Sequence, residues 1–264
     1  MDLACSTLAF TRYSLEAALR QMFELGFSYV EVAIGPNNPH LTPEGVNKRL
    51  NETAELLRCV SGITPAALLV ELESYEPRLW QQQFPALCRL ANILGVVTVT
   101  ISAAPRGCNW SQEVERLRQV AAWAFPYGVV VCVETRLGTL TETPEAAVEL
   151  CRCVPPLRLT LDPSHYLCGP SSGKSFDGVF PYVHHVHLRD SGTTPDKLQV
   201  RVGQGQMPFS RILQQLRRYD YNRLITIEMF DQPTTAGLHP MLSAPPYPLE
   251  PELRTLRLLL AGMI

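Results

Sequence analysis

The sequence predicts a single-domain α/β protein, a (β/α)8 TIM barrel spanning residues 1–264. Eight short apolar runs alternate with longer helical patterns along the chain, and this alternation is typical of a parallel sheet. Eight is the number of strands that closes this barrel, and about 250 residues is its usual length. The competing doubly wound sheet would show a glycine-rich phosphate turn after its first strand, where this chain reads TRYSLEAAL.

The elements follow one another in a regular order. We expect strands at 3–10, 29–34, 64–72, 96–102, 129–134, 157–162, 184–190 and 224–230. Helices are expected between and after them at 14–26, 42–62, 79–95, 111–125, 143–154, 176–183, 209–220 and 251–262. Cap residues mark several helix starts, namely Ser14, Thr42, Ser111 and Thr143. Glycines 26, 62 and 95 mark helix ends.

Composition excludes several classes of protein. The net charge is −2 and the pI is about 6.3, without the basic face of a nucleic-acid binder. No apolar run is long enough to span a membrane, and the first ten residues lack the pattern of a signal peptide. Eight cysteines are scattered without a CxxC pair. We therefore expect a cytoplasmic protein with reduced, mostly buried thiols and no disulfide framework.

The strands carry small polar side chains on one face. In the run 96–102, Thr98, Thr100 and Ser102 alternate with aliphatic residues, and the runs 157–162 and 224–229 alternate in the same way. In a barrel the aliphatic face meets the helices and the other face points to the axis. The sequence therefore predicts a polar axis that leads to a polar mouth.

Four ligand-type side chains lie at or near the ends of consecutive strands. Glu134, Asp162, His187 and Glu228 come from the fifth to the eighth strand, each on the axis-facing parity. The carboxyl ends of the strands form the functional rim of such barrels, and three carboxylates there need a cation to offset their repulsion. One divalent metal ion is the expected cofactor. Oxygen-rich ligation with one imidazole favours Mn²⁺ or Mg²⁺ and allows Zn²⁺ or Co²⁺.

The run VHHVHLRDSG at 183–192 holds three of the six histidines. Parity directs His184 outward, where we expect a packed, hydrogen-bonded histidine. His185 faces the axis about 7 Å below His187, since a strand rises about 3.3 Å per residue, and is expected to support the axis. Arg189 continues the inward face above His187, where it would contact substrate. Glu31 also faces the axis, either lining the site or pairing with Arg158 lower in the barrel.

Five ordered blocks resemble the xylose isomerase-like TIM-barrel superfamily, and more closely its sugar phosphate isomerase/epimerase branch. They are ETRLGTLTETPEAAVEL (134–150), LDPSHYL (161–167), HVHLRD (185–190), VGQGQMPF (202–209) and ITIEMF (225–230). The resemblance implies the same four metal ligands. It also implies that His165 contacts substrate and that Arg201, just before GQG, binds it. Arg136 departs from the family's histidine, and would either bind a substrate carboxylate or phosphate or pair with a nearby acid.

The resemblance and the residues together favour a metal-dependent ketose or aldose isomerase or epimerase acting on a sugar or sugar phosphate. The expected mechanism passes through a metal-stabilised enediolate, with Glu134 and Glu228 as catalytic acid and base. A keto-inositol-type dehydratase or a hydroxy-keto-acid isomerase would use the same chemistry. An endonuclease IV-like hydrolase would need further histidines on the third and fourth strands. A non-catalytic metal-binding barrel is the remaining alternative.

One segment stands apart from the regular alternation. The loop 231–251 after the last strand is long for a barrel and rich in proline. On the functional face it would act as a lid or as a contact in a homodimer.

Overall fold

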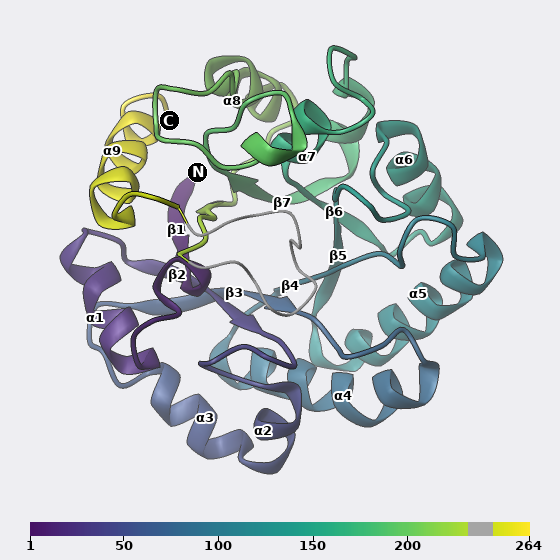
Figure 1. Cartoon of the computed structure of the whole chain (residues 1–264). Helices are drawn as coiled ribbons and strands as arrows, with labels where there is room; N and C mark the ends of the chain where they lie inside the picture. The colour runs from purple at the N-terminus through teal and green to yellow at the C-terminus, as the bar shows by residue number, and fades with distance from the viewer. Residues whose placement is uncertain (232–244) are drawn as a thin grey trace.

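The computed structural model describes residues 1–231 and 245–264, and its eight strands form one closed parallel barrel in chain order. The barrel closes because β1 pairs with β8 as well as with β2. Figure 1 shows the strands around a common centre with the helices outside them. The predicted fold is confirmed. The strands are β1 Asp2–Ser6, β2 Tyr29–Ile34, β3 Thr64–Val70, β4 Thr98–Ile101, β5 Val130–Glu134, β6 Arg158–Leu161, β7 Val183–Leu188 and β8 Leu224–Ile227.

The helices surround the barrel, apart from the short α7, which directly follows the carboxyl end of β6. They are α1 Leu15–Glu24, α2 Pro43–Lys48, α3 Leu50–Leu57, α4 Pro77–Leu94, α5 Trp110–Ala124, α6 Pro144–Cys153, α7 Pro163–Cys168, α8 Phe209–Arg218 and α9 Leu249–Ala261. Short 3-10 helices occur at η1 Thr7–Phe10, η2 Phe125–Tyr127, η3 Asp177–Tyr182 and η4 Pro195–Lys197. The helix expected at 42–62 is divided at Arg49, whose φ of −133° and ψ of 51° lie outside the helical region.

Two differences from the expected elements shape the barrel mouth. The first strand ends at Ser6, whose side chain accepts a hydrogen bond from the Leu8 amide at 3.3 Å and starts η1. The sixth strand ends at Leu161, and Asp162 caps α7, a helix that the sequence reading did not include.

The polar axis predicted from strand parity is present. Thr100 of β4 and Thr160 of β6 approach each other across the barrel, with their hydroxyl oxygens 2.7 Å apart. The alternate residues on the same strands, such as Val99 and Leu159, are buried in the hydrophobic core between strands and helices. The main apolar core therefore lies outside the barrel wall, and polar side chains occupy much of the interior.

Helix caps follow the sequence with one correction. Ser14, Thr42 and Thr143 each accept a hydrogen bond from a first-turn amide, at 3.1–3.3 Å. The cap expected at Ser111 is wrong, because α5 starts earlier at Trp110 and Asn109 accepts the bond from the Gln112 amide at 3.1 Å. Asparagine is as good a cap as serine, so the local sequence did not distinguish the two positions.

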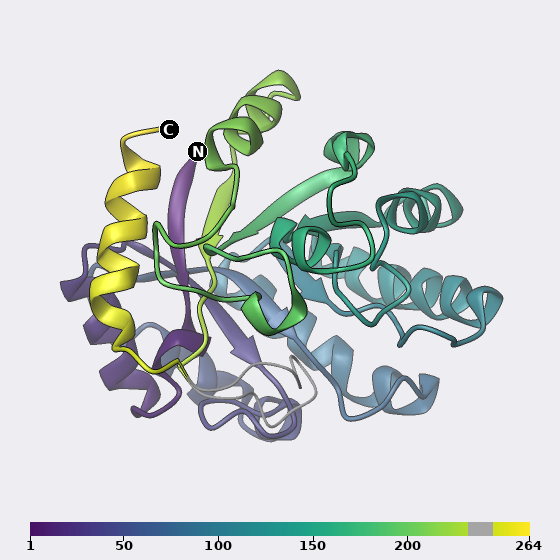
Figure 2. The same cartoon turned by 45° about the horizontal axis from the view of Figure 1, so that its top comes forward.

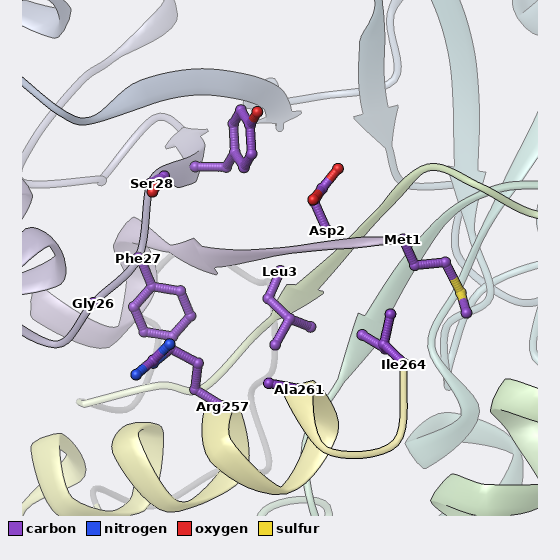
Figure 3. A pocket seen from close by; sticks show the side chains of 10 residues that line it. Met1, Asp2, Leu3, Gly26, Phe27, Ser28, Arg257, Ala261 and Ile264 are labelled. Atoms are coloured by element: carbon purple, nitrogen blue, oxygen red, sulfur yellow. The ribbon is translucent and has the colours of Figure 1, made fainter.

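The two termini lie close together, with α9 running beside β1 (Figure 2). A pocket separates the end of α9 from the turn that enters β2, and Figure 3 shows Leu3, Phe27, Arg257 and Ile264 around it. This pocket lies at the amino ends of the strands. It is therefore at the opposite end of the barrel from the four predicted ligands.

All eight cysteines lie in the part of the chain that the structure describes, and all are free thiols. Five are buried, Cys153 is half-buried, and Cys59 and Cys108 are exposed. Among the described helices, none is both long enough and apolar enough to cross a membrane.

Candidate metal centre

The four predicted ligands converge at the carboxyl end of the barrel. Glu134, Asp162, His187 and Glu228 each offer one ligand atom, and these atoms lie within 4.8 Å of one another. The Nδ1 atom of His187 is 2.9 Å from Glu134 Oε1 and 3.4 Å from Glu228 Oε1. All four residues are at most 1 % exposed. The structure therefore brings together the set that strand parity selected.

Asp162 has two separate functions at the end of β6. Its Oδ1 atom accepts hydrogen bonds from the backbone amide of Ser164 at 2.9 Å and from the Ser164 hydroxyl at 2.6 Å. These bonds cap α7 and fix the carboxylate. The Oδ2 atom faces the centre, 3.5 Å from His165 Nε2, and also accepts a bond from Arg189. A helix cap and a candidate ligand are thus the same residue.

Glu31 contacts His187 on the side of the ring away from the other three predicted ligands. Its Nε2 atom is 3.0 Å from Glu31 Oε1, while Glu31 Oε2 lies 2.7 Å from Nε2 of His185. When the Nε2–H group of His187 donates to Glu31, Nδ1 carries the lone pair. That lone pair is directed at Glu134 and Glu228. This is the arrangement that orients histidines at metal sites.

The expected pairing of Glu31 with Arg158 is not what the structure shows. Arg158 is exposed and donates to the backbone carbonyls of Pro155 and Leu157. Glu31 instead belongs to the layer just below the four ligands, where His185 also bonds Thr226 at 3.1 Å. His184 is half-buried and accepts a bond from Arg223 Nε at 3.2 Å. Burial and the nearby Arg223 lower the pKa of His184 to about 4.

Burial and mutual repulsion set the charge of the centre. Burial, together with the charge of Glu228, raises the pKa of Glu134, and burial raises the pKa of Asp162. Burial would also lower the pKa of His187, but Glu228 and Glu31 outweigh it and raise that pKa well above its usual value. Protonated His187 therefore balances part of the carboxylate charge when no cation is bound.

The donor set fits a divalent cation. Glu134 Oε2 and Glu228 Oε1 are buried and have no hydrogen-bond partner among the described residues, which is costly for carboxylate oxygens. A cation between them would satisfy both atoms. Three carboxylates and one imidazole are ligands suited to Mn²⁺, Mg²⁺ or Zn²⁺, so the residues present fit such an ion.

His165 lies beside the centre, on α7. Its Nδ1 atom accepts a hydrogen bond from the Leu137 amide at 3.2 Å, which places the ring proton on Nε2. Burial and the neighbouring Arg189 lower the pKa of His165 well below its usual value. His165 is therefore a neutral histidine with its N–H near Asp162, and its contact with substrate stays a prediction.

Arg136 pairs with an acid, the second of the two alternatives for this residue. Its Nη1 atom donates to Glu71 at the end of the third strand and to the Ser102 hydroxyl at 2.6 Å. It also lies 4.0 Å from Glu134 Oε2. The ends of the third and fourth strands thus hold this ion pair, where an endonuclease IV-like site would need histidines.

Arg189 is the most strongly bound arginine at the centre. Its guanidinium donates to Asp162, to Glu228 Oε2 at 2.8 Å and to the Ser164 hydroxyl at 3.1 Å. The side chain is fully buried and lies over the Phe230 ring, 4.9 Å from its centroid. Arg189 therefore orients two candidate ligands. A direct contact with substrate remains a prediction.

Arg201 lies farther out on the loop after β7. Its Nε atom donates to Glu252 of α9 at 3.0 Å, and the side chain is about half exposed. The GQG turn that follows is organised by Asp190. Its Oδ2 atom accepts bonds from the Gly203 and Gly205 amides at 2.8 and 3.0 Å.

The sequence did not predict that Glu31 contacts two histidines, that Glu71 pairs with Arg136, or that Asp190 organises the GQG turn. Glu31 showed the correct parity, but only the three-dimensional structure shows that it spans two histidines. Glu71 directly follows β3, as Asp162 follows β6 and Glu228 follows β8, and that position was the available signal. The long predicted loop at 231–251 falls largely on residues 232–244, outside the described residues.

The comparisons with known proteins agree with this architecture. Residues 19–258 match the sequence profile of the xylose isomerase-like TIM barrel family, and the chain belongs to that family. Among curated proteins, no significant match is found.

Solved structures with this fold cover nearly the whole chain. A D-psicose 3-epimerase from Clostridium cellulolyticum H10, solved with D-tagatose, is 19% identical, with a TM-score of 0.75 over 100% of this chain and 99% of that one. The probable 3-DHS dehydratase AsbF from Bacillus anthracis is 18% identical, with a TM-score of 0.75 and 99% of each chain covered. An IolI protein with a bound zinc atom is 18% identical, with a TM-score of 0.73 over 100% and 99%. At these identities the likeness shows the fold.

Proposed function

We propose that this protein is a divalent-metal-dependent isomerase or epimerase of a sugar or a sugar-like hydroxyketone. The observation that carries the proposal is the pair of unsatisfied buried oxygens on Glu134 and Glu228, within one cluster of four ligand groups. The structural neighbours, which include a D-psicose 3-epimerase and a zinc-binding IolI protein, support the same reading. We favour Mn²⁺ or Mg²⁺ as the ion because the ligands are mostly oxygen.

The residues of the chain supply the proton transfers. A divalent ion held by Glu134, Asp162, His187 and Glu228 would supply a Lewis acid for a substrate carbonyl. Glu134 from β5 and Glu228 from β8 approach the centre from different strands. One of them takes the proton from the carbon next to the carbonyl, and the other returns a proton to the opposite face or to the neighbouring carbon or oxygen.

Two further residues position the reactants. Neutral His165 donates its Nε2 proton toward a substrate hydroxyl. Arg189 holds the carboxylates of Asp162 and Glu228 in place through its buried guanidinium. Because the centre is buried, water is largely excluded, and the electrostatic effect of each charge on the reacting atoms is increased.

The test is solvent deuterium exchange into a bound ketose. We expect Glu134→Gln and Glu228→Gln each to lower the exchange rate at least 100-fold, because each removes one carboxylate that moves the proton. Metal content is measured on the same samples, since the amide keeps one oxygen ligand. Glu44→Gln, at an exposed position of α2, is the matched control. Unchanged exchange in both site variants would contradict the mechanism.

A dehydratase or a hydroxy-keto-acid isomerase is the second candidate, favoured by the fold likeness to a probable 3-DHS dehydratase. Both reactions start with the same proton abstraction next to a carbonyl. Product analysis by mass spectrometry separates them, since dehydration releases water and lowers the product mass by 18 Da.

A further inference from the structure

We infer that the substrate of this site is an uncharged hydroxyketone that carries neither a phosphate nor a carboxylate group. The inference rests on the proposed function and narrows its substrate class. An anionic group on a substrate needs a cationic side chain, a backbone anion site or a polar wall. Near the centre, the described arginines and backbone amides are already bonded to groups of the protein itself, and the opposite wall is apolar.

Three arginines near the centre are already paired with carboxylates, and exposed Arg12 on the rim donates to the backbone carbonyl of Asp231. Buried Arg189 pairs with Asp162 and Glu228, and buried Arg136 pairs with Glu71. On the rim, Arg201 pairs with Glu252. A substrate anion would have to displace a protein carboxylate from a buried guanidinium, and the displaced carboxylate would be left without a partner. Such an exchange is strongly unfavourable in a site that excludes water.

The backbone anion site at the GQG turn holds an internal carboxylate. Asp190 accepts hydrogen bonds from the amides of Ser191, Gly203, Gly205 and Met207, at 2.8–3.4 Å. A Cβ atom on Gly205 would fall 1.9 Å from Asp190 Oδ1, so the carboxylate fills the space inside the turn. In TIM barrels this loop is a frequent place for phosphate binding, and here its donors are in use.

The opposite wall of the mouth is apolar. Glu31 faces the axis, and Ala33, two residues later on β2, shares that face. Leu69 of β3 lies beside Ala33 in register, and both belong to one buried cluster with Leu8. This wall suits carbon atoms of a substrate and offers no charge to an anion.

The total charge of the centre also disfavours a substrate anion. Five carboxylates, from Glu31, Glu71, Glu134, Asp162 and Glu228, would face two arginines and the proposed divalent ion. With the histidines neutral, the negative charges exceed the positive charges by one. Lys174 and Lys197 are exposed to solvent, where an ion pair contributes little. Residues 232–244 contain neither lysine nor arginine.

The first test compares matched neutral and anionic substrates. Metal-loaded protein is incubated in deuterium oxide with D-fructose, D-tagatose and D-psicose, with the 6-phosphates of these ketoses, and with hydroxypyruvate. We expect exchange into at least one free ketose, at a rate at least 100-fold above its phosphate and above hydroxypyruvate. Faster exchange into an anionic compound overturns the inference and leaves the proposed function intact. Exchange into none of them, with metal bound, overturns both.

The second test releases one arginine. Glu71→Gln removes the acid that neutralises Arg136 while keeping a side chain of the same shape. We expect the ratio of kcat/KM for the ketose phosphate to that for the free ketose to rise at least tenfold. Glu16→Gln, which breaks an exposed pair with Arg20 on α1, serves as the control and should leave the ratio unchanged. An unchanged ratio in Glu71→Gln would overturn the inference.

Discussion

Glu31 is not one of the four predicted ligands, but it sets the position of the ring proton on His187. It is fully buried and bonds both His185 and His187. Burial alone would raise the pKa of Glu31, but His187 and His185 outweigh it and lower that pKa to about 2. Glu31 therefore stays ionised and keeps the Nε2 proton on His187, so that Nδ1 is free to bind a cation.

We expect Glu31→Gln to weaken divalent metal binding about 10- to 100-fold, the usual effect of losing such an outer partner. Glutamine has the same shape but offers His187 only a weaker, neutral acceptor. The measurement is a competition titration against a chelator that reports free metal. Glu52→Gln on the exposed face of α3 is the control. Equal affinity in wild type and Glu31→Gln would show that Glu31 only fills space.

At the scale of the element, strand parity predicted which four side chains converge at the carboxyl end of the barrel. The alternation along β4, β6 and β8 placed polar residues on the axis, and the four ligands followed from the same rule. Parity depends only on the two-residue repeat of a strand. The face assigned to a residue therefore stays correct even when the predicted strand ends are wrong. The ends themselves were less predictable, and the run 3–10 proved to be a strand followed by η1.

Contacts between elements were the part that sequence could not supply. Nothing local in ETRLG shows whether Arg136 meets Glu71 or a substrate, because Glu71 is 65 residues away in the chain. The same is true of Arg189, which joins Asp162 to Glu228 across three strands. These pairings depend on how the barrel closes. They emerge only when the strands are placed side by side.

The corrected cap of α5 gives a prediction at this scale. Asn109→Ala should lower the free energy of unfolding by about 1 kcal/mol, because the Gln112 amide loses its acceptor. Ser111→Ala, within the first turn, should change it by less than about 0.5 kcal/mol. Urea unfolding followed by circular dichroism measures both. A larger effect at Ser111 than at Asn109 would contradict the cap assignment.

At the scale of the whole molecule, the barrel separates reactive from protected thiols. Burial raises the pKa of Cys88 and Cys151 to about 12 and that of Cys168 to about 11. Cys5 and Cys132 are buried as well, and burial raises their pKa values further. Cys59 and Cys108 are the two exposed cysteines, and Cys153 is half-buried.

Iodoacetamide at pH 8 should therefore modify Cys59 and Cys108 rapidly in the native protein, with Cys153 slower. The buried thiols should react only after unfolding, since alkylation requires an accessible thiolate. Peptide mass spectrometry at successive times gives the order. Early modification of Cys5 or Cys132 would show that the barrel opens far more readily than its packing suggests.

We propose one metal centre at the carboxyl end of the barrel, and metal stoichiometry tests that proposal most directly. Equilibrium dialysis of the intact protein against Mn²⁺, with elemental analysis, should give one ion per chain. Asp162→Ala and His187→Ala should each reduce binding to a small fraction of this value, while both variants keep the wild-type circular dichroism spectrum. Three ions per chain, or one ion retained in both folded variants, would contradict the assignment of the four ligands.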